Sequence, residues 1–128
     1  MIPYYRAKSN ERKNTYVEGL LIGIDEELNL CTIRTKDDYI GGEICYLHTL
    51  SINFPDMLDS QGNKIFASLQ EDGKGGDLID NFWFTEKYRI QIAIYTDNCF
   101  YLVDVDSDRH NLKEYINKGG IRVMGIQK

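Results

Sequence analysis

Apolar and polar residues alternate in short runs over most of the chain, which predicts strands rather than long helices. The clearest run is 88–96, where isoleucine occupies every second position from 90 to 94. Asp97 and Asn98 then predict a two-residue turn into a partner strand over 99–105. Shorter runs predict further strands over 2–6, 15–24, 28–34, 39–47, 65–69 and 121–126.

One helix is predicted close to the C-terminus. Asn111 and Glu114 have the spacing of a capping box, in which the Asn side chain accepts from a first-turn amide and the Glu reaches back to the cap. The helix should run to Lys118 and end at the pair Gly119 and Gly120. The pattern therefore predicts a mainly-β domain (a β-rich α+β fold) with one short helix before the last strand. A small curled sheet or SH3-like barrel suits such short strands.

Composition places the chain among ordinary globular proteins. Its 128 residues suit a single domain, and 42% hydrophobic with 27% charged residues exclude a disordered or fibrous chain. No apolar run is long enough for a secretory signal or a membrane span. We therefore expect no membrane association and, by default, a cytoplasmic location.

The charge distribution bears on nucleic acid as a partner. A formal net charge of −5 argues against a protein that coats DNA or RNA. Basic residues nevertheless gather near the N-terminus as Arg6, Lys8, Arg12 and Lys13. We interpret this patch, 6–13, as a solvated hairpin tip; a nucleic-acid-associated module that uses it is an alternative.

The three cysteines, Cys31, Cys45 and Cys99, are widely spaced and odd in number. They contain no C-x-x-C pair, so a disulfide framework or a zinc site is poorly supported. Each lies among β-type residues, which predicts buried or half-buried, unreactive thiols.

Alternating acids over 104–108 resemble calcium ligands. The EF-hand template fails, because Arg109 stands where glycine is needed and Tyr115 where glutamate is needed. We therefore interpret the acids as part of a solvated turn at a strand end and expect no metal site.

The glycine-rich loop 72–77 suggests a cradle for an anion. Its backbone amides, from Gly73 to Gly76, together with Lys74 are the basis of an alternative in which the chain binds a small nucleotide or anion. The spacing is not that of a phosphate-binding loop, and flanking acids would repel phosphate. We therefore favour a flexible hairpin loop.

No catalytic pattern emerges from the two histidines. His48 and His110 lack companions at helical or hairpin spacing. Cys45 and His48 would point to opposite faces of one strand, so they do not suggest a nucleophile–base pair. We therefore expect no enzyme, no catalytic residue and no cofactor.

Aromatic residues are numerous for one small domain: nine Tyr, five Phe and one Trp. Core packing needs some of them, and an exposed remainder would form a binding surface for a protein partner. The candidate interaction residues are Tyr4, Tyr5, Phe82, Trp83, Phe84 and Tyr88.

Three segments resemble the YopX-like family of phage and prophage proteins. They are 2–7 followed by 16–20, then 58–66 followed by 76–79, and finally 121–126. The residues that carry the family signature are Arg6, Ala7, Gly62, Asn63, Lys64, Ile65, Phe66, Gly76 and Asp77.

The resemblance implies a single domain over 1–128, with N-terminal strands over 1–58 and an SH3-like roll over 59–128. It implies a viral or prophage gene and implies no reaction. From the residues themselves we interpret the signature as structural, with Gly62 in a turn and Gly76 and Asp77 at the start of a strand. We therefore expect a non-enzymatic binding or accessory protein that acts on a protein partner in the cytoplasm of the bacterial host. Nucleic acid is disfavoured as a partner, and the sequence leaves a homo-oligomer open.

Overall fold

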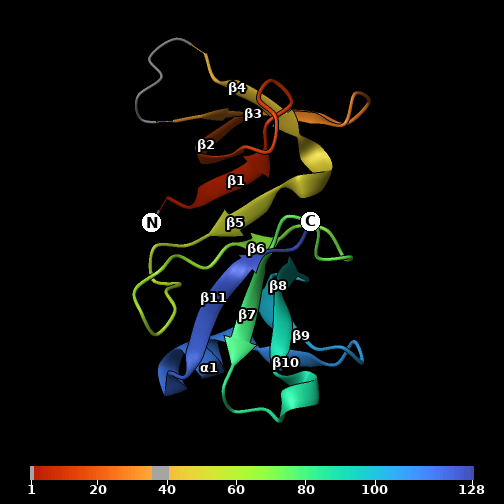
Figure 1. Cartoon of the computed structure of the whole chain (residues 1–128). Coiled ribbons are helices and arrows are strands. Elements are labelled where there is room, and N and C mark those ends of the chain that lie inside the picture. The colour runs from red at the N-terminus through yellow and green to blue at the C-terminus, as the bar shows by residue number, and fades with distance from the viewer. Residues whose placement is uncertain (1, 36–40) are drawn as a thin grey trace.

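The computed structural model of the chain describes residues 2–35 and 41–128 (Figure 1). Within them strands dominate, and one α-helix precedes the last strand, as predicted. The strands are β1 (Tyr4–Lys8), β2 (Tyr16–Asp25), β3 (Leu30–Arg34), β4 (Glu43–Tyr46), β5 (Ser51–Asn53), β6 (Ala67–Ser68), β7 (Asp77–Asn81), β8 (Ile90–Thr96), β9 (Cys99–Val103), β10 (Arg109–Asn111) and β11 (Ile121–Ile126). The helix is α1 (Leu112–Lys118), and two 3₁₀ turns are η1 (Leu47–Thr49) and η2 (Glu86–Tyr88).

The N-terminal half is a curled antiparallel sheet of β1, β2, β3 and β4, paired in chain order (Figure 1). Its two ends meet, because Ser9 bridges to Cys45 and the Asn10 amide donates to the Ile44 carbonyl at 2.9 Å. Apolar side chains fill the inside of this sheet: Ala7, Val17, Cys31, Ile33, Cys45 and Leu50.

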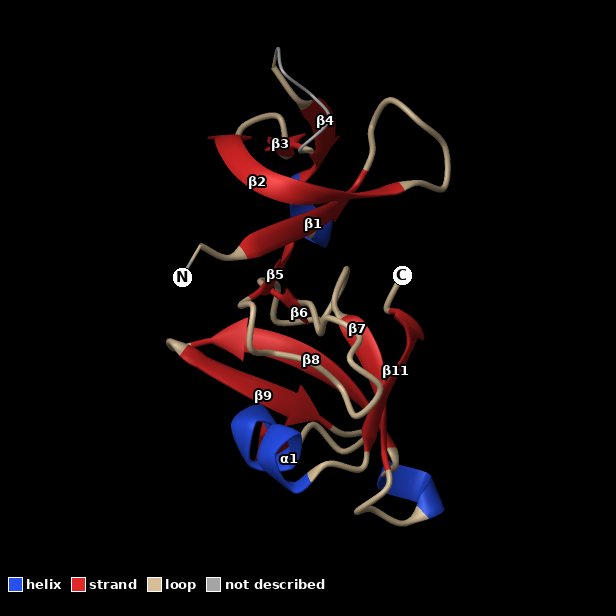
Figure 2. Cartoon of the chain, turned by 90° about the vertical axis from the view of Figure 1, so that its left-hand side faces the viewer, coloured by secondary structure: helices blue, strands red, loops and turns tan. Residues whose placement is uncertain are grey.

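The C-terminal half is a second antiparallel arrangement. Strands β7, β8, β9 and β10 pair in that order, and β11 pairs with the other side of β7. Helix α1 lies against β9 with Leu112 fully buried (Figure 2). The second core consists of Ile52, Met57, Ile65, Ala67, Ile79, Ala93, Phe100, Leu102, Leu112 and Ile121.

Two short strands connect the halves. β5 pairs with β1 on one side and with β6 on the other, and β6 pairs in parallel with β8 through Ser68 and Ile94. The eleven strands of the described chain therefore belong to one hydrogen-bonded sheet. Tyr5 and Leu69 lie where the halves meet, because each packs against both cores.

The predicted hairpin and helix are confirmed. β8 and β9 pair in antiparallel register around Asp97 and Asn98, whose φ angles of 53° and 61° suit a tight hairpin turn. The Asn111 side chain accepts from the first-turn amide of Lys113 at 3.0 Å. The predicted return contact of Glu114 is replaced by an ion pair with Lys118 at 3.1 Å.

Other predictions need correction. β5 and β10 were not predicted, because each has only three residues, which is too short for an alternating pattern to show. β5 also depends on β1, a partner distant in sequence, whereas β10 pairs with the preceding strand β9. Of the strand predicted over 39–47, residues 39 and 40 lie outside the described residues and the strand itself begins at Glu43. An SH3-like barrel over 59–128 is not confirmed, because β6 pairs outward with β5 and β11 pairs with β7 alone. Across the described ranges, no helix combines the length and the apolar character that crossing a bilayer requires.

Candidate functional site

Three of the signature residues meet at the junction between the two halves. The Arg6 guanidinium donates to the Asp77 carboxylate and to the Gly75 carbonyl, both at 2.8 Å. The other Asp77 oxygen accepts the Phe66 amide at 2.8 Å, and the Arg6 guanidinium carbon lies 4.5 Å from the centroid of the Phe66 ring. Both ionic side chains are buried. The prediction that Arg6 belongs to a solvated hairpin tip is therefore wrong.

Burial also sets the protonation chemistry of this ion pair. Desolvation raises the pKa of Asp77 above its ordinary value, although Arg6 and the Phe66 amide both act in the opposite direction. A buried pair of this kind fixes geometry more than it adds stability. Its place in the structure is consistent with a structural role for the signature.

The glycine-rich loop is packed against the protein rather than solvated. Gly75 has a φ of 84°, and a Cβ at this position would lie 1.9 Å from the Thr49 carbonyl oxygen, so only glycine fits. Every backbone amide from Gly73 to Gly76 already donates to an oxygen of the protein. None of these four amides is therefore left to hold an anion.

The remaining central signature residues build a turn around Asp59. Its carboxylate accepts the backbone amides of Gln61, Asn63 and Val123 at 2.8 to 2.9 Å. Burial on its own raises the pKa of Asp59, but these hydrogen bonds outweigh burial and hold the pKa below its ordinary value. Gly62 takes a φ of 83° in this turn.

The rest of the N-terminal basic patch is only partly available. Arg12 forms a two-pronged ion pair with Glu43 at 2.7 and 2.9 Å, and Lys8 is half-buried. With Arg6 inside the molecule, Lys13 is the residue of the patch that is exposed and has no ion pair among the described residues. This geometry offers little support for the nucleic-acid alternative.

The prediction that the acids of 104–108 form a solvated turn needs correction, because one of them is not solvated. Asp104 is buried and accepts the backbone amides of Asp106 and Asp108. Its other oxygen lies 2.8 Å from Nε2 of His110, and this hydrogen bond lowers the pKa of Asp104. Within residues 2–35 and 41–128, no group of three or more His, Cys, Asp or Glu side chains is arranged to hold a metal ion.

Two cysteines fit the prediction and one does not. Cys31 and Cys45 are buried cross-strand neighbours, and burial raises their pKa values to about 11 and about 12. Cys99 is exposed at the start of β9, which corrects the prediction that all three thiols are buried or half-buried.

The candidate interaction residues do not form one surface. Tyr4 and Tyr5 lie in β1, close to the junction of the two halves, while the segment 82–88 follows β7 at the far end of the C-terminal half (Figure 1). Tyr5 packs between the two cores. Tyr4 is exposed, with the Lys64 ammonium 4.1 Å from the centroid of its ring.

Phe82 and Trp83 are the exposed members of the second group, with 51% and 58% of their surface accessible. The Trp83 ring is fixed in place, because its Nε1 donates to the Gly119 carbonyl at 2.8 Å. The backbone is fixed as well, because the Phe82 amide donates to the Gly120 carbonyl and the Trp83 amide to the buried Asn81 side chain. Both rings therefore project from a rigid support.

Cations surround these two rings. The guanidinium carbons of Arg89 and Arg122 lie 4.2 and 5.8 Å from the Phe82 centroid, and the Lys118 ammonium lies 5.2 Å from that of Trp83. We call these five residues the aromatic–cationic surface. Both guanidiniums also contact one carboxylate, that of Asp80.

Phe84 and Tyr88 lie beside this surface but are half-buried. The Phe84 ring is 4.6 Å from that of His110 and 5.7 Å from that of Tyr115, so it packs against β10 and α1. A hydrogen bond with Asp106 raises the pKa of Tyr88. Because both are half-buried, they offer less contact area to a partner than Phe82 and Trp83 do.

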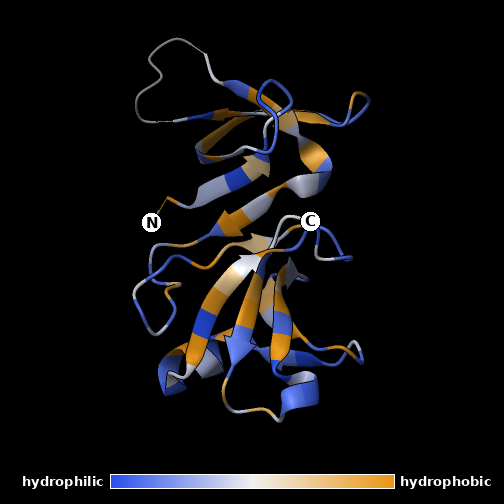
Figure 3. Cartoon of the chain, viewed as in Figure 1, coloured by the Kyte–Doolittle hydropathy of each residue, from blue (hydrophilic) through white to orange (hydrophobic). Residues whose placement is uncertain are grey.

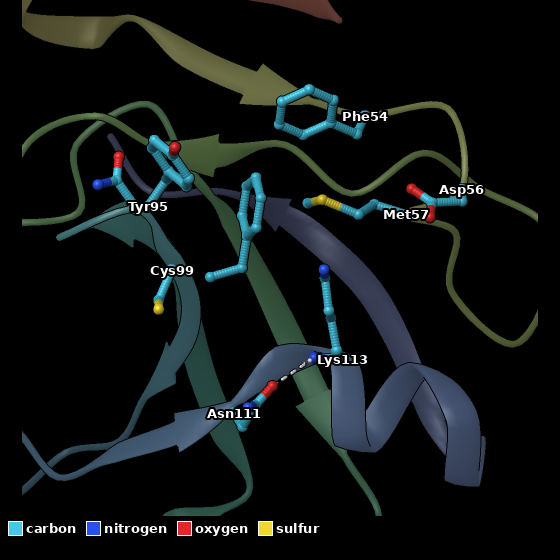
Figure 4. Close-up of a pocket in the computed structure, with 9 residues that line it drawn as sticks. Phe54, Asp56, Met57, Tyr95, Cys99, Asn111 and Lys113 are labelled. Carbon is cyan, nitrogen blue, oxygen red and sulfur yellow. Dashed lines mark hydrogen bonds between the residues drawn. The ribbon is translucent and has the colours of Figure 1, made fainter. Parts of the chain in front are cut away.

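A separate pocket of about 540 Å³ lies between α1, the β8–β9 hairpin and the segment after β5 (Figure 4). Apolar side chains form one part of its lining: Phe54, Met57, Tyr95 and Phe100. Polar side chains form the other part: Asp56, Asn98, Cys99, Asn111 and Lys113. Sequence patterns do not indicate this pocket, because its three walls are far apart along the chain.

The pocket combines aromatic rings with hydrogen-bonding groups. Phe100 is in contact with Phe54 and Tyr95, at centroid distances of 5.6 and 4.5 Å. Lys113 extends from the start of α1 toward Met57 (Figure 4). Among the residues that the structure describes, Lys113 has no salt-bridge partner, so its charge is available to a ligand.

Comparison of the chain with models of known protein families, with curated proteins and with solved structures finds no match. The aromatic–cationic surface and the pocket are the two candidate sites of the chain.

Proposed function

We propose that this chain is a non-enzymatic binding module that acts on a protein partner through the aromatic–cationic surface. The observation that carries the proposal is the rigid exposure of Phe82 and Trp83 next to three cations. Exposed aromatics that are already held in position lose little entropy when a partner covers them, which makes them effective anchors.

The chemistry of the surface indicates what the partner offers. Two apolar recesses would receive the rings of Phe82 and Trp83. Arg89 and Arg122 share the single carboxylate of Asp80, so their remaining N–H groups suit carboxylates of the partner. The partner is therefore a protein segment that carries both apolar recesses and acidic side chains.

From the resemblance to the YopX-like family of phage and prophage proteins, we also propose that this binding takes place in the cytoplasm of a bacterial host. The contacts among Arg6, Phe66 and Asp77 support it, because three residues of the quoted signature converge at one structural junction. In this proposal the signature maintains the fold and the aromatic–cationic surface performs the binding.

The proposal is tested by comparing the proteins that three versions of the chain capture. The wild-type chain, a Phe82→Ala/Trp83→Ala variant and a Tyr4→Ala control are each used for affinity capture from infected host lysate, with quantitative mass spectrometry. We expect a partner protein that the wild type and the control both capture. The captured amount of this protein should fall at least about tenfold with the double variant, since two anchors are lost. A capture profile that is identical for all three baits would contradict the proposal.

The pocket supports a second candidate function, the binding of a small aromatic ligand. Its rings can stack on a flat ligand, and Asn98, Asn111 and Lys113 can read polar edges or an anionic group. Thermal melts with AMP and GMP test this function. Stabilisation that disappears in Lys113→Met supports nucleotide binding, and unchanged melting at millimolar nucleotide contradicts it.

A further inference from the structure

The N-terminal sheet carries large aliphatic side chains on the outside as well as in its core. Leu20, Ile22 and Ile24 of β2, Leu28 of the following turn and Ile44 of β4 are 39 to 66% exposed. Figure 3 shows hydrophobic segments on these strands at the top of the molecule. A sheet that is apolar on both faces is expected to be covered on both faces.

The strand register shows which residues share the outer face. Gly23 pairs with Thr32, and Thr32 pairs with Ile44, so the three form one cross-strand row. This row lies opposite the buried pair of Cys31 and Cys45, because adjacent residues of a strand point to opposite faces. We call these three residues the apolar row, which carries no charged group and, at Gly23 on its β2 end, no side chain.

The same register places opposite charges at the two ends of this face. Leu20 pairs with Arg34 at one end, and Asp25 pairs with Leu30 at the other. Positions 30, 32 and 34 alternate onto the same face, so Arg34 and Asp25 both border the apolar row. Glu26 and Glu27 add further negative charge beside Asp25.

The outer face also has a hollow beside protruding side chains, so its shape can complement that of a second copy. Leu28, Leu30 and Ile44 line a shallow hollow of about 370 Å³, together with Gly23, which has no side chain. Leu20 and Ile22 stand outside this hollow on the same strand. One face therefore provides both the protruding side chains and the recess that can receive them.

We propose that this outer face is the interface of a symmetric dimer of the chain. A twofold axis that sets the two β2 strands antiparallel brings Asp25 of each copy to Arg34 of the other. It also brings Leu20 and Ile22 of each copy toward the hollow of the other. Because an isologous interface must match itself, apolar relief and opposite charges on a single face are what it requires. This dimer does not depend on the aromatic–cationic surface, which lies in the other half.

The first test is the mass of the purified full chain by light scattering and sedimentation at increasing concentration. We expect a species of twice the 14.8 kDa of one chain. Ile44→Lys and Leu20→Lys should return it to the monomer, while Val105→Glu, an exposed site in the other half, should leave the dimer intact. A wild-type monomer up to about 1 mM would overturn the proposal, since a dissociation constant above that value is too weak for a specific interface. A dimer that survives both lysine variants would overturn it as well.

The second test uses charge exchange. In Arg34→Glu, and separately in Asp25→Lys, both charge contacts of the dimer become repulsive. When the two variants are mixed, each contact again joins opposite charges, so the heterodimer should form in preference to either homodimer. Native mass spectrometry reads the three species, and a statistical mixture would overturn the proposed geometry. Hydrogen exchange of the wild type supplies a check without substitutions: residues 20–34 should gain protection as concentration rises, and unchanged exchange would contradict the interface.

Discussion

The Arg6 guanidinium and the Asp77 carboxylate lie 2.8 Å apart although 71 residues separate them in the chain. This ion pair joins β1 of the N-terminal half to β7 of the C-terminal half, at the point where Phe66 also contacts both partners. The segments that carry Arg6, Phe66 and Asp77 are thus held together by side-chain contacts, in addition to the pairing of the short strands β5 and β6.

The first prediction concerns this pair. Arg6→Met leaves the Asp77 carboxylate buried without its cation, and should cost about 3–5 kcal/mol of unfolding free energy. Adding Asp77→Asn removes the orphaned charge, so the double variant should be less destabilised than the sum of the two single variants. Urea melts of the four proteins measure the coupling.

Arg12→Met provides the matched control for that cycle. The Arg12–Glu43 pair has similar distances but an exposed arginine, so solvent screening should make its loss much smaller. Additive effects at Arg6 and Asp77, or an equal loss at Arg12, would show that the junction pair has no special role.

Local features of the structure could be predicted from the sequence, but contacts between distant residues, such as those at the junction, could not. The hairpin of β8 and β9 and the helix after Asn111 could be predicted, because alternation, turn and cap signals are all local. The burial of Arg6 could not be predicted from charge patterning, since its partner is remote. The same reason explains the missed pocket, whose lining comes from residues 54–57, 95–100 and 111–113.

The exposed β2 face marks another limit. The sequence predicts a strand that includes Leu20, Ile22 and Ile24, but it does not indicate which side of the strand faces solvent. The register with β3 and the shift between Leu21 and Gly23 decide it. A one-residue change in register exchanges the two faces of a strand, so the sequence pattern alone cannot assign an exposed apolar face.

The second prediction concerns thiol reactivity. Because burial raises the pKa values of Cys31 and Cys45 to about 11 and about 12, neither should carry appreciable thiolate near neutral pH. Iodoacetamide should modify only Cys99 in the native protein and all three cysteines in urea. Intact-mass spectrometry counts the adducts. In Cys99→Ser, native labelling should vanish, and persistent fast labelling would show that the β3–β4 region opens readily.

The third prediction concerns acid stability. The folded pKa of Asp59 is held below its unfolded value by the amides that it accepts. Its contribution is therefore fully present above the unfolded pKa, near about 4, and is lost as pH falls through the lower folded pKa. Asp59→Asn should be less stable at neutral pH by about 1–3 kcal/mol, because the amide cannot accept every donor. It should also lose less stability on acidification than the wild type.

Unfolding free energies of Asp59→Asn measured from pH 7 down to pH 2 test this expectation. Glu71→Gln is the control, because Glu71 lies in an exposed turn away from both proposed interfaces. Parallel pH profiles for wild type and Asp59→Asn would show that the turn carboxylate is not linked to folding.

The last prediction concerns the cap of α1, which also borders the pocket. Because Asn111 accepts the Lys113 amide at 3.0 Å, Asn111→Ala leaves a first-turn donor without its partner and should cost about 0.5–2 kcal/mol. Asn111→Ser keeps a capping oxygen and should stay close to wild type, while Asp106→Ala, in the exposed turn, should cost less than about 0.5 kcal/mol. Urea melts separate these cases. If serine were as harmful as alanine, the loss would come from the pocket wall rather than from the cap. An equal loss at Asp106 would show that its hydrogen bond with Tyr88 contributes to the fold as much as the cap does.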